Sequence, residues 1–354
     1  MWGKDSSQDG RKHQLLRTLE ADAQSRETFA RYRFVIRSEH QRNDDDKGGN
    51  HNGALEFVER IWKKWSARTM KIGLNLPPTT QSPDQFCAWV RWVDAGPFST
   101  LGVLDRVVSS NFEPLVTLAA AAALTTHVRL MTEILIAPIR NAALLAKESA
   151  TLDILSRGRL TLGLGLGGRE DDYLAAGVSY EQRGKRLEEQ LEQMKRIWAG
   201  QRVHANGGPI GPRPIQTNGP ELLLGGYAPR AIQRVTRYAD GIITGINDIK
   251  QIDQTFRAVE QGWQEAGRAG KPRLVAQIDI ALETHDGGQG RKNVLDYYAV
   301  LPSFAASKSA TLLTTEQQLS DTMHALEQIG TDEVVFFTWS TGIDQIDRIA
   351  DLLG

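Results

Sequence analysis

The sequence has 354 residues, of which 40% are hydrophobic, and its formal net charge is −1 at pH 7. A chain of this length can bury the core of one large domain or two small ones, and its balanced charge gives no bulk attraction to nucleic acid or to an anionic membrane. Cys87 is the single cysteine, residues 1–20 lack an apolar signal stretch and no metal-ligand cluster is visible, so we expect a cytoplasmic protein with no disulfide, metal, nucleic-acid or membrane partner.

Residues 1–69 differ in composition from the rest of the chain. They hold 14 Lys and Arg and 11 Asp and Glu, so 25 of 69 residues are charged, against 24% in the whole chain. Five apolar residues in this region have the spacing of one face of a short helix: Leu55, Val58, Ile61, Trp62 and Trp65. We predict a charged, disordered N-terminal extension. Two alternatives stay open: a mis-assigned start, with Met70 as the true first residue, or a docking segment.

From Met70 onward the chain alternates strand and helix patterns, which is typical of a parallel sheet with helical crossovers. The expected strands are residues 71–76, 100–104, 128–137, 159–164, 221–224, 241–244, 274–282 and 334–337. The expected helices begin near Ser82, which has the pattern of a helix cap, and then cover residues 113–125, 141–155, 180–199, a segment from about 228, 248–267, 290–300, 315–330 and a closing segment near 346–353. Eight strands with helical crossovers predict a single α/β domain, a (β/α)8 TIM barrel over residues 70–354. An open, doubly wound sheet is the alternative.

Two glycine clusters follow neighbouring expected strands. One runs from Gly163 to Gly168, and the other is Gly225 with Gly226, just before a helix that begins near Ala228. Reacting groups of such barrels lie at the carboxyl ends of the strands, and glycine lets backbone N–H groups approach a phosphate closely. The clusters therefore indicate a phosphate cradle, while tight strand-to-helix turns without a ligand remain the alternative.

Three charged residues at expected strand ends are candidates for catalysis. Asp105 and Arg106 follow the second strand, either as a catalytic or orienting pair or as a loop salt bridge. Glu133 lies inside an otherwise apolar strand, where a carboxylate is costly unless it is paired or faces a polar cavity. Asp279 follows the same logic with a weaker case. Because no arrangement of histidine with serine or cysteine accompanies these acids, we expect a bound cofactor to supply the chemistry.

The stretch AKESATLDILSRGRLTLGLG at residues 146–165 is the most specific motif of the chain. Together with Gly177 and Arg183, the LGG at 224–226 and the ADG at 239–241, it makes residues 70–354 similar to the luciferase-like flavin-dependent oxidoreductases. That family includes bacterial luciferase-type monooxygenases and deazaflavin-dependent reductases. The resemblance covers nothing before Met70.

The resemblance implies the barrel and a flavin or deazaflavin, FMN or coenzyme F420, lying across its carboxyl-end mouth. It also implies a bulge with a non-prolyl cis peptide in the third strand, which we place at Glu133–Ile134. We expect these residues to bind the cofactor: Asn75, Thr132, Ile134, Gly165, Gly167, Gly168, Gly225, Gly226 and Tyr227. We expect these residues to be catalytic: Asp105, Arg106 and Glu133.

The chain departs from the family pattern at three positions. The family often has Asp-His where this chain has Asp105-Arg106, the usual glycine before Thr132 is Met131, and Glu133 is itself unusual. We expect a monooxygenase that uses reduced FMN and O2; the alternatives are a deazaflavin-dependent dehydrogenase or reductase and a non-catalytic flavin-binding barrel. The expected partners are a small-molecule substrate, a flavin or deazaflavin reductase as electron donor, and a second copy in a homodimer.

Overall fold

The computed structural model describes residues 70–78, 82–282, 288–342 and 344–353. The predictions made for residues 1–69, both the disordered extension and the short amphipathic helix, lie outside the described residues. Over the described ranges, no helix is both long enough and apolar enough to cross a bilayer.

Between residues 70 and 353, the described part of the chain forms one closed barrel of nine parallel strands. They are β1 (Lys71–Asn75), β2 (Thr100–Val103), β3 (Arg129–Thr132), β4 (Leu135–Ile136), β5 (Leu160–Gly165), β6 (Glu221–Gly225), β7 (Gly241–Thr244), β8 (Arg273–Ile280) and β9 (Glu333–Thr338). The order is β3-β2-β1-β9-β8-β7-β6-β5, and β3 also pairs with β5, which closes the sheet. Both β3 and β4 pair with β5, so together they form a single strand of the barrel that is interrupted by a bulge. With β3 and β4 counted as one strand, the barrel has eight strands, which confirms the predicted (β/α)8 barrel. The closure of the sheet excludes the open doubly wound sheet.

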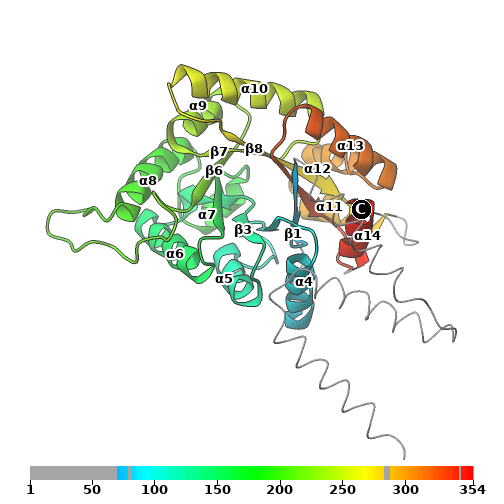
Figure 1. The fold of residues 1–354 in the computed structure, drawn as a ribbon, viewed down its shortest axis with the longest axis horizontal. Helices are drawn as coiled ribbons and strands as arrows, with labels where there is room; N and C mark the ends of the chain where they lie inside the picture. Colours follow the sequence, from blue (N-terminus) through cyan, green and yellow to red (C-terminus); the bar gives the residue numbers. More distant parts are fainter. Residues whose placement is uncertain (1–69, 79–81, 283–287, 343, 354) are drawn as a thin grey trace, which may run out of the picture. The chain divides into compact units, whose positions relative to one another are not determined.

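Helices surround the strands in the described part of the chain (Figure 1). They are α4 (Pro83–Ala95), α5 (Pro114–Leu124), the 3-10 turn η1 (Ala137–Ile139), α6 (Ala142–Leu155), α7 (Glu170–Ala175), α8 (Arg183–Trp198), α9 (Pro229–Tyr238), α10 (Ile249–Glu265), α11 (Gln289–Tyr297), α12 (Pro302–Ala310), α13 (Glu316–Gln328) and α14 (Asp344–Leu353). The helix start predicted at Ser82 is confirmed, because Ser82 and Gln85 form a reciprocal capping box.

The strand and helix patterns of the sequence did not predict two of the helices or the interruption of the third strand. Helix α7 opens with three acidic residues, and α12 consists mainly of small residues, so neither has an apolar stripe that would predict a helix. The strand expected over 128–137 is divided into β3 and β4 at the bulge. Helices α7, α11 and α12 lie beyond the carboxyl ends of strands, where they shape the mouth of the barrel.

A polar layer fills the barrel at the amino ends of the strands. Arg273 pairs with both Glu221 and Glu333, Thr161 donates a hydrogen bond to Glu221 at 2.6 Å, and Arg129 pairs with Glu221 at 3.3 Å. Above this layer lies an apolar layer to which five strands contribute: Met131, Leu223, Ile243, Val275 and Val335. The two layers fill the interior of the barrel, and the reacting groups of such barrels lie at the carboxyl ends of the strands.

Candidate active site at the carboxyl end of the barrel

The bulge between β3 and β4 shapes the floor of the mouth. The peptide bond between Glu133 and Ile134 is cis, which confirms the position predicted from the resemblance. The Ile134 side chain turns inward and packs against the apolar layer. It occupies the space next to two glycines that were predicted to bind the cofactor. A Cβ on Gly165 would lie 2.2 Å from Ile134 Cδ1, and a Cβ on Gly225 would lie 2.4 Å from the same atom. These two glycines therefore make room for Ile134 at the floor.

Asp105 holds the backbone directly after the bulge. Its Oδ2 accepts a hydrogen bond from the Ile136 N–H at 2.8 Å, and both of its oxygens lie 3.0 Å from Arg140 Nη2. Burial raises the pKa of the Asp105 carboxyl, while Arg140 opposes that rise. Both oxygens are thus engaged, and the geometry suits a residue that positions the bulge more than one that meets a substrate.

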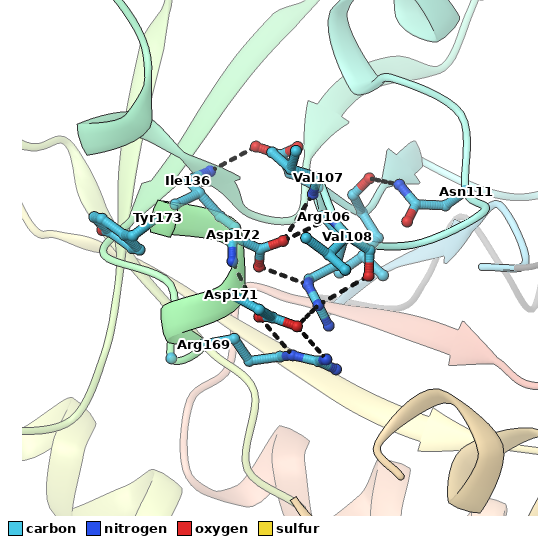
Figure 2. Close-up of polar contacts among 12 residues, drawn as sticks. Arg106, Val107, Val108, Asn111, Ile136, Arg169, Asp171, Asp172 and Tyr173 are labelled. Atoms are coloured by element: carbon cyan, nitrogen blue, oxygen red, sulfur yellow. Dashed lines mark hydrogen bonds and ion pairs between the residues drawn. The ribbon is translucent and has the colours of Figure 1, made fainter. Parts of the chain in front are cut away.

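Arg106 does not face Asp105 but joins the loop after β2 to helix α7 (Figure 2). Its Nε donates to Asp172 Oδ2 at 2.7 Å, and Asp172 Oδ1 accepts from the N–H groups of Val107 and Val108, each at 2.9 Å. Of the two predicted alternatives, the structure shows Arg106 in a salt bridge, although with Asp172 and not with its neighbour. A catalytic role for Arg106 stays a prediction.

A second ion pair extends this network toward α11. Arg169 pairs with Asp171 at 2.6 Å and donates to the carbonyl of Tyr297 at 3.2 Å. The bond from Arg169 lowers the pKa of the Asp171 carboxyl. Arg169 is therefore held by α7 and α11.

Glu133 and Asn75 are buried polar residues without partners. Glu133 is 1% exposed and Asn75 is 0% exposed, and neither the two carboxyl oxygens nor the amide O and N of these side chains have a hydrogen-bond partner. They meet in front of Gly102, where a Cβ would lie 2.3 Å from Glu133 Oε2 and 2.5 Å from Asn75 Oδ1. Burial, followed by the charges of Glu333 and Asp279, raises the pKa of Glu133 well above its ordinary value.

The two glycine turns lie at the same end of the barrel, because β5 and β6 are paired parallel neighbours. The turn after β6 leads into α9, whose N-terminus has no side-chain cap and no acidic residue in its first turn. The turn after β5 leads into α7, which places three acids there. Gly226 has φ 135°, and Gly168 has open space where a side chain would be. The N-terminus of α9, beside exposed Tyr227, suits an anion better than that of α7, because no acidic side chain lies in its first turn.

Two residues near the mouth were missed as site candidates. Arg183, noted only as part of the family match, stacks on the ring of Tyr180 at 3.7 Å, and the Tyr180 hydroxyl donates to the Gly168 carbonyl at 3.3 Å. The buried Nε of Arg183 has no partner, so a cation lies close to the glycine turn. Lys308 on α12 donates to Asp279 at 2.5 Å and had no sequence signal, since a single lysine in a short helix resembles a surface residue.

A cavity of about 460 Å³ lies at the carboxyl end of the barrel. Its lining comes from the loop after β2, from α7, from α11 and from the end of β9: Pro78, Val108, Ser109, Ser110, Arg169, Asp171, Asn293, Asp296, Tyr297, Ala299, Val300 and Trp339. Asp279 lies beside it, where its carboxylate also accepts from Trp339 Nε1 at 2.9 Å. The lining mixes aromatic, aliphatic and polar side chains, which suits a small organic substrate.

Comparison with known proteins identifies relatives over the barrel. The family model described as luciferase-like monooxygenase matches residues 70–328. An uncharacterized protein of Mycobacterium tuberculosis is 34% identical over 183 residues, which are 50% of this chain and 64% of that protein. A phthiodiolone/phenolphthiodiolone dimycocerosates ketoreductase of the same species is 30% identical over 183 residues, 48% of each chain. The matched part thus spans less than two thirds of the length of either relative.

Solved structures share the fold at low sequence identity. The monooxygenase RslO1 from Streptomyces bottropensis superposes with a TM-score of 0.67 and 19% identity, over 80% of this chain and 97% of that one. An F420-dependent secondary alcohol dehydrogenase, solved with an F420-acetone adduct, gives 0.65 and 17%, over 80% and 98%. The oxygenating constituent of 3,6-diketocamphane monooxygenase from Pseudomonas putida, solved with FMN, gives 0.61 and 14%, over 81% of this chain and 96% of that one.

Proposed function

The chain belongs to the luciferase-like monooxygenase family, and from this premise we propose that it is an oxidoreductase that binds a flavin or a deazaflavin at the carboxyl-end mouth of its barrel. One observation carries the proposal: the uncapped N-terminus of α9, the open turn at Gly168 and the bulge at Ile134 all lie at the same end of the barrel. A cofactor with an anionic tail and a flat apolar ring needs such a pairing of a polar cradle with an apolar floor.

The N-terminus of α9 is the proposed site for the cofactor phosphate. Its first turn has no side-chain cap, and the helix dipole adds positive potential there, although Pro229 has no N–H and the Ala231 N–H donates to the Ala228 carbonyl at 2.8 Å. Gly168 leaves the backbone accessible, while Arg183 and Arg230 provide cations nearby. The residues therefore fit a phosphate, and Gly165 and Gly225 also make room for Ile134 at the floor.

The proposed seat of the ring is the floor formed by Ile134. This side chain is only half buried, and the strands beneath it make room with Gly165 and Gly225. Asp105 fixes the backbone that follows, through the Ile136 N–H. Thr132, whose hydroxyl donates to the Gly163 carbonyl at 2.7 Å, braces the strand before the bulge. Ile134 would contact the ring, and Asp105 and Thr132 would hold Ile134 in place.

Monooxygenation with reduced FMN and O2 is the reaction we propose first. The bound cofactor would supply the oxygen chemistry, and the chain would exclude water from it. The aromatic cluster of Tyr297, Tyr298 and Trp339 covers one side of the mouth and offers such a dry wall. A small-molecule substrate would enter through the cavity beside this cluster, and a separate flavin reductase would supply electrons.

Hydride transfer with coenzyme F420 is the second candidate. It is favoured by the ketoreductase among the relatives, whose name describes reduction of a carbonyl group. In that case a deazaflavin would take the place of FMN, a deazaflavin reductase could supply electrons, and O2 would not be needed. A flavin-binding barrel without catalysis is the third candidate, motivated by Arg106 and Met131 at positions where the family pattern has other residues.

Two measurements separate these candidates. Fluorescence titration of the purified protein with FMN and with coenzyme F420 gives the cofactor, and we expect one of them to bind much more tightly. Oxygen uptake in the presence of reduced FMN and a set of small organic substrates then tests monooxygenation. If oxygen uptake does not depend on any of these substrates, and the protein reduces a carbonyl compound with coenzyme F420, hydride transfer is favoured over monooxygenation. Failure to bind either cofactor would refute the proposed function. A homodimer, which we also propose, would appear as a doubled mass in light scattering.

A further inference from the structure

Glu133 is a buried acid that forms no salt bridge with any residue in the described part of the chain. It is 1% exposed, and neither oxygen has a hydrogen-bond partner. The charged groups that act on it are Glu333 on β9 and Asp279 on β8, both acidic. Each of those acids already has its own cation, since Glu333 pairs with Arg273 and Asp279 with Lys308. An ionised Glu133 would therefore be a buried charge without compensation, which is among the most costly arrangements in a protein.

Asn75 is the polar side chain that shares this space. It lies at the carboxyl end of β1, fully buried and without partners for its amide O and N. Gly102 on β2 stands between the two residues, and a Cβ there would lie within 2.5 Å of oxygens from both. The three neighbouring strands thus bring an acid and an amide to one point, with a glycine where any side chain would separate them.

Unpaired buried polar atoms are rare in folded proteins, and a cluster of four calls for a physical reason. The two residues lie immediately beside the Ile134 floor, since Glu133 is the residue before it in the bulge. A protonated acid can donate a hydrogen bond and carries no charge, so it does not repel electron density placed above it. The same residue in its ionised form would repel it strongly at this depth.

We propose that Glu133 selects the charge state of the ligand bound in the mouth. It keeps its proton in the folded protein, and in that form it favours an electron-rich, anionic conjugated ring over the Ile134 floor; loss of the proton would disfavour that ring. Asn75 is its positioning partner. This inference rests on the proposed function for the identity of the ligand as a redox-active ring, whereas the proton on Glu133 can be tested without any ligand.

The first test measures the proton directly. Infrared spectra of the full-length protein without cofactor are compared for the wild type, Glu133→Gln, and a matched control, Glu189→Gln, which changes an exposed carboxyl on α8. At neutral pH we expect a protonated-carboxyl band in the wild type and in the control and its loss in Glu133→Gln. In the wild type alone, this band should disappear as pH is raised, so the result does not depend on a variant. A wild type with only carboxylate bands overturns the proposal.

The second test measures charge selection. The affinities for oxidised and for reduced FMN, or for both forms of coenzyme F420, are compared from about pH 6 to about pH 9. We expect the preference of the wild type for the reduced form to fall with rising pH, by up to about tenfold per pH unit once Glu133 ionises, relative to Glu133→Gln. Identical pH profiles in wild type and Glu133→Gln overturn the proposal. If neither cofactor binds at any pH, the proposed function fails and charge selection fails with it, while the infrared band still decides whether Glu133 holds its proton.

Discussion

The side chain of Ile134 lies directly in front of Gly225, so that a Cβ on this glycine would stand 2.4 Å from Ile134 Cδ1. The same side chain stands 2.2 Å from the position of a Cβ on Gly165. The bulge between β3 and β4 and the glycines of β5 and β6 are therefore parts of one arrangement. The bulge turns the Ile134 side chain into the mouth, and the two glycines leave the space that this side chain occupies. The glycines in these two clusters therefore have two roles: some form the turns after the strands, and others make room for Ile134 at the floor.

This contact gives a first prediction, on Gly225→Ala. The added methyl group forces Ile134 to move, and we expect a loss of about 1–3 kcal/mol in the free energy of unfolding together with weaker cofactor binding. Ile134→Val removes the Cδ1 atom that causes the collision. The double variant should therefore lose less stability in urea denaturation than the two single variants do together. Strict additivity would show that Ile134 and Gly225 do not share this space.

The fold could be predicted from the sequence because its signals are local. Strand and helix patterns alternate eight times after Met70, and each strand was found within a few residues of its expected position. The strand expected over residues 128–137 was predicted least well. It is broken by a bulge, and a bulge leaves no trace in the periodicity of apolar residues. The resemblance supplied what periodicity could not, namely the cis bond at Glu133–Ile134.

The site could be predicted only in part, because its contacts join distant segments. Arg106 binds Asp172, which lies 66 positions along the chain, and Lys308 reaches Asp279 from a helix that has no apolar stripe. Nothing in the spacing of these residues indicates such pairs. The sequence marked Glu133 as anomalous by chemistry alone, whereas its isolation with Asn75 depends on which strands become neighbours in the closed barrel.

The second prediction concerns Arg106→Ala. The Arg106 side chain is 7% exposed and that of Asp172 is 0% exposed, so removing the cation leaves a buried carboxylate with only backbone donors. Breaking such a pair costs about 3 kcal/mol or more. We expect a lower free energy of unfolding in urea, with partial recovery in Arg106→Ala combined with Asp172→Asn. An unchanged stability with a large fall in kcat would instead support a catalytic Arg106.

The third prediction tests the phosphate cradle through Gly168→Asp. A side chain at Gly168 meets no atom within 4 Å, so the variant should fold normally. Its carboxylate would repel a cofactor phosphate nearby by roughly 1–2 kcal/mol, which corresponds to a loss of affinity of about five- to thirtyfold. Gly208→Asp is the matched control, because Gly208 also has open space and lies in the loop before β6. Equal affinities of the two variants would move the phosphate away from this turn.

The fourth prediction concerns the boundary at Met70. The family match begins at residue 70, and a compact unit extends from Thr69 to Leu352. A chain that begins at Met70 should therefore keep its cofactor affinity and unfold within about 1 kcal/mol of the full-length protein. The comparison uses urea denaturation and fluorescence titration of both chains. Insolubility or loss of cofactor from the shorter chain would show that residues 1–69 belong to the fold.

The last prediction concerns the pH dependence of stability. In the folded protein the pKa of Glu133 lies well above its ordinary value because of burial, so at a pH between the two values the folded chain holds a proton that the unfolded chain has released. Raising the pH in this window favours the unfolded chain. The contribution of Glu133 is fully present below its ordinary pKa and is lost as pH rises, with a slope of up to about 1.4 kcal/mol per pH unit.

Glu133→Gln removes this titration while keeping the size and shape of the side chain. We therefore expect the variant to gain stability relative to the wild type as pH rises from about 5 to about 8. The difference between the two urea denaturation curves isolates Glu133, because Asp105, whose pKa burial also raises, titrates in both proteins and cancels. A difference that stays constant over this range would mean that Glu133 is ionised in the folded protein or that its pKa is close to that of an exposed glutamate. In either case an uncharged acid could not account for the unpaired oxygens beside Asn75, and the floor of the mouth would carry a negative charge.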